Sequence, residues 1–327
     1  MRPPPSVEVV LFDSPLTLRG TATEAAGSVL RGQLVVRLFD DVTELKAITL
    51  HLKGREQVFW SEGFGKHQTL VRQKKNLIDH TWSFLNPSPS PAVTAATLTK
   101  LGPGEHVFDF DVVIPGSLPE TTHTEHGHVT YKLRAEVAYP GFRKNLTHEL
   151  VLPVKRQPLG SSVEWMQSLI IDDAWDRFIA YTIMAPSKIY ADNSTITLDM
   201  NFTPRGKGVR VLAVSGLLKE YIRFNNYLRN NADQSQQTSN SAPPAVRRLT
   251  QVITRVDQTP PNSQKPLTDA GLSLSLALSV PQAYKHIQYD AVTNFMEIQH
   301  KIKVLIKLQD HQRKIHHIYI AAPVVIM

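Results

Sequence analysis

The chain has 327 residues, of which 42% are hydrophobic and 20% are charged, and its formal net charge is +7 at pH 7. A chain of this length can bury two separate cores, so two domains are expected. It contains no cysteine, which excludes a disulfide framework, a cysteine-ligated metal site and a thiol nucleophile, and favours a reducing, cytoplasmic compartment.

The first residues, MRPPPS, lack the long apolar core of a signal peptide, and no run of about 18 apolar residues that could span a membrane follows. The excess of basic residues favours acidic partners, such as acidic protein tails or an anionic membrane surface. Binding to nucleic acid is not expected, because the Lys and Arg residues are scattered in small groups and not clustered with aromatic residues on one element.

Alternation of apolar and polar residues is the dominant pattern along the chain, and it predicts strands with one buried face. In chain order the alternating segments are 34–38, 48–52, 108–112, 129–137, 196–202, 272–278 and 302–308. Glycine and proline mark turns between them, at 102–104, 115–116, 140–141 and 204–206. One-sided strands are typical of antiparallel sheets packed face to face. The predicted class is therefore all-β, with two immunoglobulin-like antiparallel β-sandwich domains.

The boundary between these domains is expected where the alternation stops, at Pro158 and Gly160. This gives a first sandwich over residues 1–158 and a second over 159–327, joined by a short hinge near residues 155–164. Just beyond it, VEWMQSLII could form a short helix over residues 163–171. Three segments rich in Pro, Asn, Gln or Ser are predicted to be loops: 86–91, 229–248 and 259–266.

Three histidines within six residues, His123, His126 and His128, raise the question of a metal site. From Gly127 onward the side chains alternate, so His128 is expected to begin the solvent face of a strand, with His123 and His126 in the preceding turn. Zinc accepts three histidines, but a solvated loop supplies little to orient the rings. A strand entry is the preferred interpretation, and a metallohydrolase that uses these histidines is kept as an alternative.

No other catalytic motif is present. The segment 63–67, GFGKH, contains a Gly-Lys pair but lacks the earlier glycine and the following Ser or Thr of a P-loop. The GxSxG element of serine hydrolases is missing as well. We therefore expect a protein without catalytic activity and without a cofactor.

Several stretches together resemble a known family. In the first half they are AAGSVLRGQLVVRL (25–38), AITLHLKGREQVFW (47–60) and LGPGEHVFDF to GHVTYKLRAEV (101–137). In the second half they are ITLDMNFTPRGKGVRVLAVSGLLKEYIRF (196–224), KIKVLIKLQD (301–310) and IYIAAPVVI (318–326). In order and spacing they resemble the arrestin fold and, within it, the fungal α-arrestins, or arrestin-related trafficking adaptors. The opening histidines then fill a variable loop between two family landmarks, Leu118-Pro119 and Gly127-Tyr131.

This resemblance implies a non-catalytic adaptor, cytoplasmic and peripheral at the plasma membrane and endosomes. It would bind the cytosolic tails of membrane transporters or receptors and link them to a WW-domain HECT-type ubiquitin ligase, so that the cargo is ubiquitinated and endocytosed. Basic residues suit acidic tails and the anionic lipid surface of the inner leaflet. The candidate partner-binding residues form three patches: Arg72, Lys74 and Lys75; Arg205, Lys207 and Arg210; and Arg247 with Arg248.

The sequence departs from the family in its ligase motif. Family members dock WW domains through Pro-Pro-x-Tyr or Leu-Pro-x-Tyr, yet none of the nine tyrosines here has a proline two positions before it. The ligase motif is therefore expected in a tail absent from this chain, which would be the arrestin core of a longer protein. Two alternatives keep the fold: a pH-signalling arrestin that partners a membrane sensor, and a retromer-like sorting-coat subunit.

Overall fold

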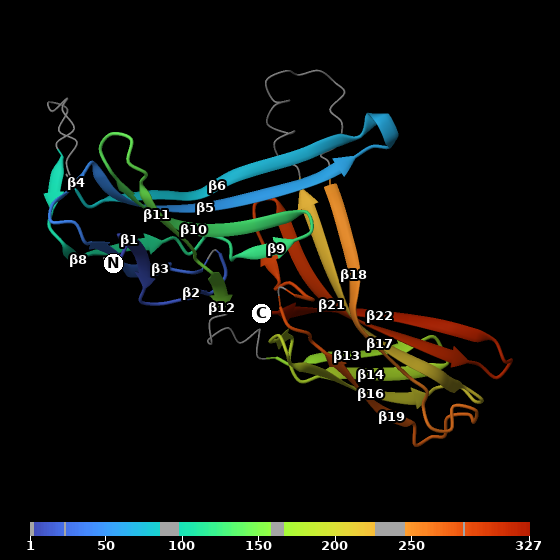
Figure 1. Cartoon of the computed structure of the whole chain (residues 1–327). Helices are drawn as coiled ribbons and strands as arrows, with labels where there is room; N and C mark the ends of the chain where they lie inside the picture. Colours follow the sequence, from blue (N-terminus) through green and yellow to red (C-terminus); the bar gives the residue numbers. More distant parts are fainter. Residues whose placement is uncertain (1–2, 23, 86–97, 158–166, 226–245, 284) are drawn as a thin grey trace. The chain divides into compact units, whose positions relative to one another are not determined.

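The computed structural model describes residues 3–22, 24–85, 98–157, 167–225, 246–283 and 285–327. The chain divides into two compact units, Met1–Leu159 and Gly160–Met327, called unit 1 and unit 2 below. Both are built almost wholly from β-strands (Figure 1). The expected domain boundary and residues 158–164 of the expected hinge lie outside the described residues.

Unit 1 contains two main antiparallel sheets. The first has the order β1-β3-β8, with β1 at Ser6–Leu11, β3 at Ser28–Leu38 and β8 at Gly104–Ile114. The second has the order β11-β10-β5-β6, with β9 paired to β10; its strands are β5 (Ala47–Glu62), β6 (Thr69–Ser83), β9 (Thr122–Thr124), β10 (Gly127–Ala138) and β11 (Leu146–Val151). Two short pairs complete it: β2 (Leu16–Arg19) with β12 (Val154–Gln157), in parallel, and β4 (Thr43–Leu45) with β7 (Thr99–Leu101).

The core of unit 1 forms where the apolar residues of alternating strands face inward. Leu50 and Leu52 of β5 are fully buried, as is Leu133 of β10 on the paired strand. Gly54 lies opposite Tyr131, and a Cβ at this position would come within 2.6 Å of the tyrosine ring. The missing side chain therefore makes the space that the Tyr131 ring fills.

Unit 2 also consists of two sheets, which are antiparallel except that β15 pairs in parallel with β22. One has the order β13-β14-β16-β19, with strands β13 (Leu169–Trp175), β14 (Ile179–Ala185), β16 (Thr195–Pro204) and β19 (Leu272–Ser279). The other has the order β15-β22-β21-β17-β18, with β20 paired to β21; its strands are β15 (Ile189–Tyr190), β17 (Arg210–Asn225), β18 (Val246–Gln258), β20 (Ala291–Val292), β21 (Met296–Gln309) and β22 (Ile315–Ile326). Apolar residues of both sheets, such as Leu198 and Val304, form one buried cluster between them.

A charged cluster is also buried in unit 2. Nδ1 of His300 lies 2.6 Å from Asp290 Oδ2, and Nε2 lies 3.3 Å from Glu220 Oε2. Burial alone lowers the pKa of His300, but the hydrogen bonds to Asp290 and Glu220 outweigh it and raise the pKa to about 9. The backbone N–H of Ile326, at the end of β22, donates to Asp290 as well. The protonated imidazole therefore holds the end of β22 and the segment before β20 to the sheet.

The all-β prediction with two sandwich domains is confirmed, and every alternating segment lies within a strand. The prediction of a short helix over residues 163–171 is wrong for Leu169–Ile171, which begins β13 and pairs with β14. Residues 163–166 lie outside the described residues. Of the predicted loops, 86–91 and 229–245 also lie outside them, and 246–248 is wrong because it begins β18. Residues 259–266 form turns. In the part of the chain that the structure describes, no helix has the length and apolar character needed to cross a bilayer.

Candidate docking surfaces

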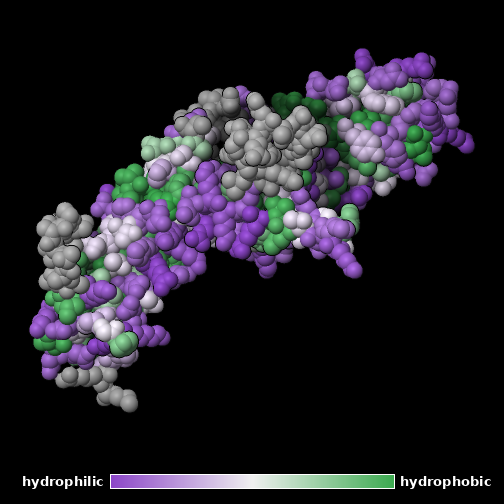
Figure 2. Space-filling view, turned by 90° about the horizontal axis from the view of Figure 1, so that it is seen from above, coloured by the Kyte–Doolittle hydropathy of each residue, from purple (hydrophilic) through white to green (hydrophobic). Residues whose placement is uncertain are grey.

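Hydrophilic side chains cover much of the face drawn in Figure 2, with smaller hydrophobic areas between them. One strongly basic surface is a groove of about 770 Å³ on the solvent face of β5 and β10. It forms because the residues between the buried leucines of each strand face outward. We call it the basic groove, because four basic side chains (Lys53, Arg55, Lys132 and Arg134) outnumber its two carboxylates (Glu136 and Glu149); His51, His123 and His128 also line it.

The register of β5 and β10 brings positive charges directly together in this groove. Lys53 lies opposite Lys132, and like charges in directly opposite positions destabilise a sheet. Both ammonium groups have a neighbouring carboxylate: Lys53 Nζ lies 3.7 Å from Asp79, and Lys132 Nζ lies 2.5 Å from Glu149. The hydrogen bond from Lys132 lowers the pKa of Glu149. The lysine pair is thus neutralised within unit 1.

Two guanidinium groups of the groove remain available. The guanidinium groups of Arg55 and Arg134 make no hydrogen bond or close ion pair with the residues that the structure describes, although Arg134 lies opposite Glu149 and helps to lower the pKa of its carboxyl. Arginine presents a planar fork of donors that fits a carboxylate or phosphate in a bidentate manner. The groove can therefore accept anionic groups at these two positions.

His123 and His128 line the groove, but the three histidines are not arranged as a metal site. His123 belongs to β9 and lies opposite His128, with ring centroids 6.3 Å apart, so the prediction that His123 lies in a turn is wrong. The ring of His126 instead meets the edge of Phe59. Burial lowers the pKa of His128, and His123 and Arg72 lower it further. No group of three His, Asp or Glu side chains among the described residues is placed to hold a metal ion.

A second basic surface lies on unit 2. We call it the lysine row: Lys219 on β17 and Lys301, Lys303 and Lys307 on β21. Lys219 lies directly opposite Lys301. The Nζ atoms of Lys301 and Lys303 lie 5.6 and 5.8 Å from the centre of the Tyr221 ring, close enough for a cation–π interaction. A smaller groove of about 300 Å³ adjoins Lys307.

The three predicted patches lie elsewhere. Arg72, Lys74 and Lys75 are exposed on β6; Arg205 and Lys207 lie in the turn after β16, and Arg210 begins β17. None of them lines the basic groove. Arg247 and Arg248 are adjacent on β18, so their side chains point to opposite faces and cannot form one patch. Whether these residues bind a partner stays a prediction.

Sequence reasoning missed both basic surfaces, although a signal was present. Basic residues occupy the outward positions of the alternating segments, at 53 and 55, at 132 and 134, and at 301, 303 and 307. Alternation shows which residues face solvent. It does not show which distant strand lies beside them, and that neighbour decides whether charges gather.

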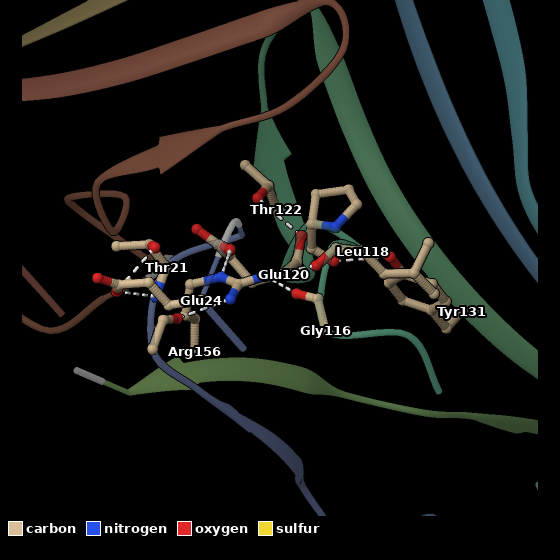
Figure 3. A network of polar contacts seen from close by, with 10 residues as sticks. Thr21, Glu24, Gly116, Leu118, Glu120, Thr122, Tyr131 and Arg156 are labelled. Carbon is tan, nitrogen blue, oxygen red and sulfur yellow. Dashed lines mark hydrogen bonds and ion pairs between the residues drawn. The ribbon is translucent and has the colours of Figure 1, made fainter. Parts of the chain in front are cut away.

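A polar network in unit 1 fixes the segment that leads to His123 (Figure 3). Arg156, on β12, donates to Glu120 Oε2 at 3.3 Å. Its other nitrogens donate to three backbone carbonyl oxygens: Gly20 at 2.7 Å, Gly116 at 2.9 Å and Leu118 at 2.7 Å. The side chains of Arg156 and Glu120 are only 17% and 7% exposed, so this is a largely buried ion pair with further hydrogen bonds to the guanidinium.

Hydrogen bonds from Tyr131 and Thr122 also hold the segment of residues 116–122. The hydroxyl of Tyr131 donates to the carbonyl oxygen of Pro119 at 2.6 Å, and burial raises the pKa of this hydroxyl. The hydroxyl of Thr122 donates to the carbonyl oxygen of Glu120. The segment therefore enters β9 in a fixed position, which sets where His123 lies in the basic groove.

Comparison with known protein families supports the interpretation of both units. The model of the N-terminal domain of arrestin (or S-antigen) matches residues 22–156, and that of the C-terminal domain matches residues 175–327. Together they cover most of the chain.

Individual relatives are fungal proteins. One is the "HECT-type ubiquitin ligase-interacting protein creD" of Emericella nidulans, 25% identical over 331 residues, which cover 97% of this chain and 51% of the relative. Two come from Schizosaccharomyces pombe: the "Arrestin domain-containing protein C31A2.12", 25% identical over 95% of this chain and 49% of the relative, and the "Putative arrestin-related trafficking adapter C2D10.04", 23% identical over 98% and 54%. The chain thus spans about half the length of the curated relatives it matches. With both domain models matched in order, the chain belongs to the arrestin family.

Proposed function

We propose that this protein is a non-catalytic adaptor that binds acidic cytosolic segments of membrane transporters or receptors and links them to a HECT-type ubiquitin ligase. The cargo is then ubiquitinated and endocytosed. The observation that carries the proposal is the basic groove, where the guanidinium groups of Arg55 and Arg134 make no hydrogen bond with the described residues. An acidic peptide segment supplies carboxylates that accept hydrogen bonds from these two groups.

The relatives support the ligase half of the proposal. One of them is named as a HECT-type ubiquitin ligase-interacting protein and another as a trafficking adapter. The 327 residues carry no Pro-Pro-x-Tyr or Leu-Pro-x-Tyr. The ligase is therefore recruited, in this proposal, through another segment of the protein or another kind of contact.

The proposed place of action is the cytosolic face of the plasma membrane and of endosomes. The net charge of +7 favours an anionic lipid surface as well as acidic tails. Arg72, Lys74 and Lys75 are candidates for such contacts, since all three are exposed on β6. Arg205, Lys207 and Arg210 are further candidates, as is Arg248. Arg247 is a weaker one, because its Nε is buried.

The test is affinity purification after mild crosslinking, from fungal cells that express the protein. The wild type is compared with Arg55→Gln/Arg134→Gln and with a control pair of substitutions, Lys265→Gln/Lys314→Gln, which removes two exposed charges outside every proposed binding patch. We expect the wild type and the control to retrieve membrane transporters together with a HECT-type ligase. The groove variant should retain the ligase and lose the transporters.

Other outcomes would overturn the proposal. Retrieval of a fixed set of sorting-coat subunits without a ligase would assign the protein to a coat, and retrieval of a single membrane sensor without a ligase would assign it to signalling. Equal capture of transporters by the groove variant would show that the groove is not the docking site.

A further inference from the structure

The lysine row of unit 2 contains a repulsive contact that the described residues leave uncompensated. Lys219 of β17 and Lys301 of β21 are direct cross-strand partners. Like charges in this arrangement destabilise a sheet. Among the residues that the structure describes, neither Lys219 nor any of the three lysines on β21 makes an ion pair or a hydrogen bond through its side chain.

Unit 1 provides the comparison. There the equivalent pair, Lys53 and Lys132, lies between two strands that each bring a carboxylate to one of the lysines. On unit 2 the neighbours of the pair are Val252 on β18 and Pro323 on β22, which carry no charge. An arrangement that lowers stability and has no compensating group in its own sheet is suited to an external anion.

The surroundings favour a peptide over a simple ion. Tyr221 lies beside two of the lysines, Val252 is 49% exposed and Tyr319 is 77% exposed. Their partners in the sheet place them on the same face as the lysine row. A peptide segment with both acidic and apolar side chains would contact all of these groups, whereas a single small anion would contact only the lysines.

The spacing of the lysines favours an extended segment. Residues two apart on a strand lie about 6.8 Å apart on the same face. Lys301 and Lys303 are therefore about 6.8 Å apart along β21, and Lys307 lies about 13.6 Å beyond Lys303. An extended peptide presents its own alternate side chains with the same repeat. A lipid surface has no such repeat. Figure 1 shows β21 lying between β17 and β22, so a peptide on it would follow the middle of the sheet.

We propose that the lysine row is a second docking surface, which binds an extended acidic segment of a partner protein whose carboxylates occupy alternate positions. This inference rests on the proposed adaptor function, and it assigns the second surface to another part of the same cargo tail. The carboxylates lie between the lysines and relieve the repulsion between Lys219 and Lys301.

Two fluorescein-labelled peptides of equal charge test the spacing by fluorescence anisotropy with the full chain at low ionic strength. In one, Glu and Ser alternate; in the other, pairs of Glu alternate with pairs of Ser. We expect the alternating peptide to bind more tightly. Lys219→Gln/Lys301→Gln should weaken binding of the alternating peptide by about tenfold, as expected for the loss of two ion pairs, whereas the control Lys265→Gln/Lys314→Gln should not. Both pairs are repeated in an Arg55→Gln/Arg134→Gln background, which removes binding in the basic groove.

A stability measurement distinguishes this proposal from the alternative that the lysine row is exposed to solvent and binds no partner. Lys301→Glu turns the repulsive pair into an attractive one, so it should raise the melting temperature of unit 2 and at the same time weaken the alternating peptide. A lower melting temperature, or equal affinity of both peptides for the lysine row, would overturn the proposal. Loss of binding to phosphatidylserine-containing vesicles in Lys219→Gln/Lys301→Gln, with unchanged peptide binding, would assign the row to lipid instead.

The proposed adaptor function can fail separately. If the lysine variants leave capture of transporters intact and the groove variant abolishes it, only the second surface is refuted. If neither set of substitutions affects capture, the adaptor proposal based on acidic tails is refuted as well.

Discussion

Replacing Arg156 by Met should cost more stability than any other single loss of charge in unit 1. The substitution keeps a long apolar side chain but removes the guanidinium hydrogen bonds to Glu120 and to three carbonyl oxygens. Removing one partner of a buried ion pair typically costs about 3–5 kcal/mol. Both side chains are less than one fifth exposed, so water can replace little of the loss and we expect about 4 kcal/mol.

Arg37 offers a matched control on the surface of the same unit. It also contacts two carboxylates, Glu8 at 3.1 Å and Glu105 at 2.8 Å, but its side chain is 40% exposed. Solvent screens such pairs, so Arg37→Met should shift the unfolding midpoint much less than Arg156→Met. Arg37 makes more ion pairs than Arg156, but its side chain is more exposed and Arg156 donates to three carbonyl oxygens as well.

Urea unfolding followed by tryptophan fluorescence is a suitable assay, because Trp60 and Trp82 both lie in unit 1. The cycle of Arg156→Met, Glu120→Gln and the double variant measures the coupling between the two side chains, for which we expect about 2 kcal/mol. Equal destabilisation by Arg156→Met and Arg37→Met would refute the argument that burial makes the network strong. A coupling energy near zero would show that Glu120 is not part of it.

Three other predictions concern separate features. The raised pKa of His300, about 9, means that its stabilising contribution is complete below the unfolded value of 6.5 and is lost as pH rises through 9; His300→Gln should flatten that decline in the melting temperature of unit 2. Gly54→Ala should destabilise unit 1 by about 1–3 kcal/mol in urea unfolding because the new Cβ meets the Tyr131 ring; an unchanged midpoint would contradict this packing argument. Lys74→Glu/Lys75→Glu should weaken binding of an acidic peptide at low salt and have little effect at high salt, and unchanged binding at low salt would reject that patch.

Much of the fold could be predicted because strand periodicity is local. The alternation at 48–52 and 302–308 identifies both the strand and its buried face without knowledge of the rest of the chain. The segment 163–171 shows the limit of this reasoning. A short apolar run such as Leu169–Ile171 fits a helix or a strand equally well, and its pairing with β14 decides for the strand.

The basic surfaces could not be predicted in the same way, because they depend on register between distant strands. Lys53 and Lys132 meet only because β5 and β10 pair with one particular alignment, and the same is true of Lys219 and Lys301. A shift of one residue would turn every side chain of a strand to the other face. Arg247 and Arg248 are neighbours on β18, so their side chains point to opposite faces; whether either binds a partner stays a prediction.

The polar network also sets an order of events during protein synthesis. Arg156 joins β12 to Gly20, which lies 136 residues earlier, and β12 pairs in parallel with β2 at the start of the chain. Contacts over such a distance form only after nearly all of unit 1 has left the ribosome. Until then the segment from Gly116 to Glu120 lacks its guanidinium donor. The nascent N-terminal domain must therefore wait for residue 156 before the wall of its basic groove can be completed.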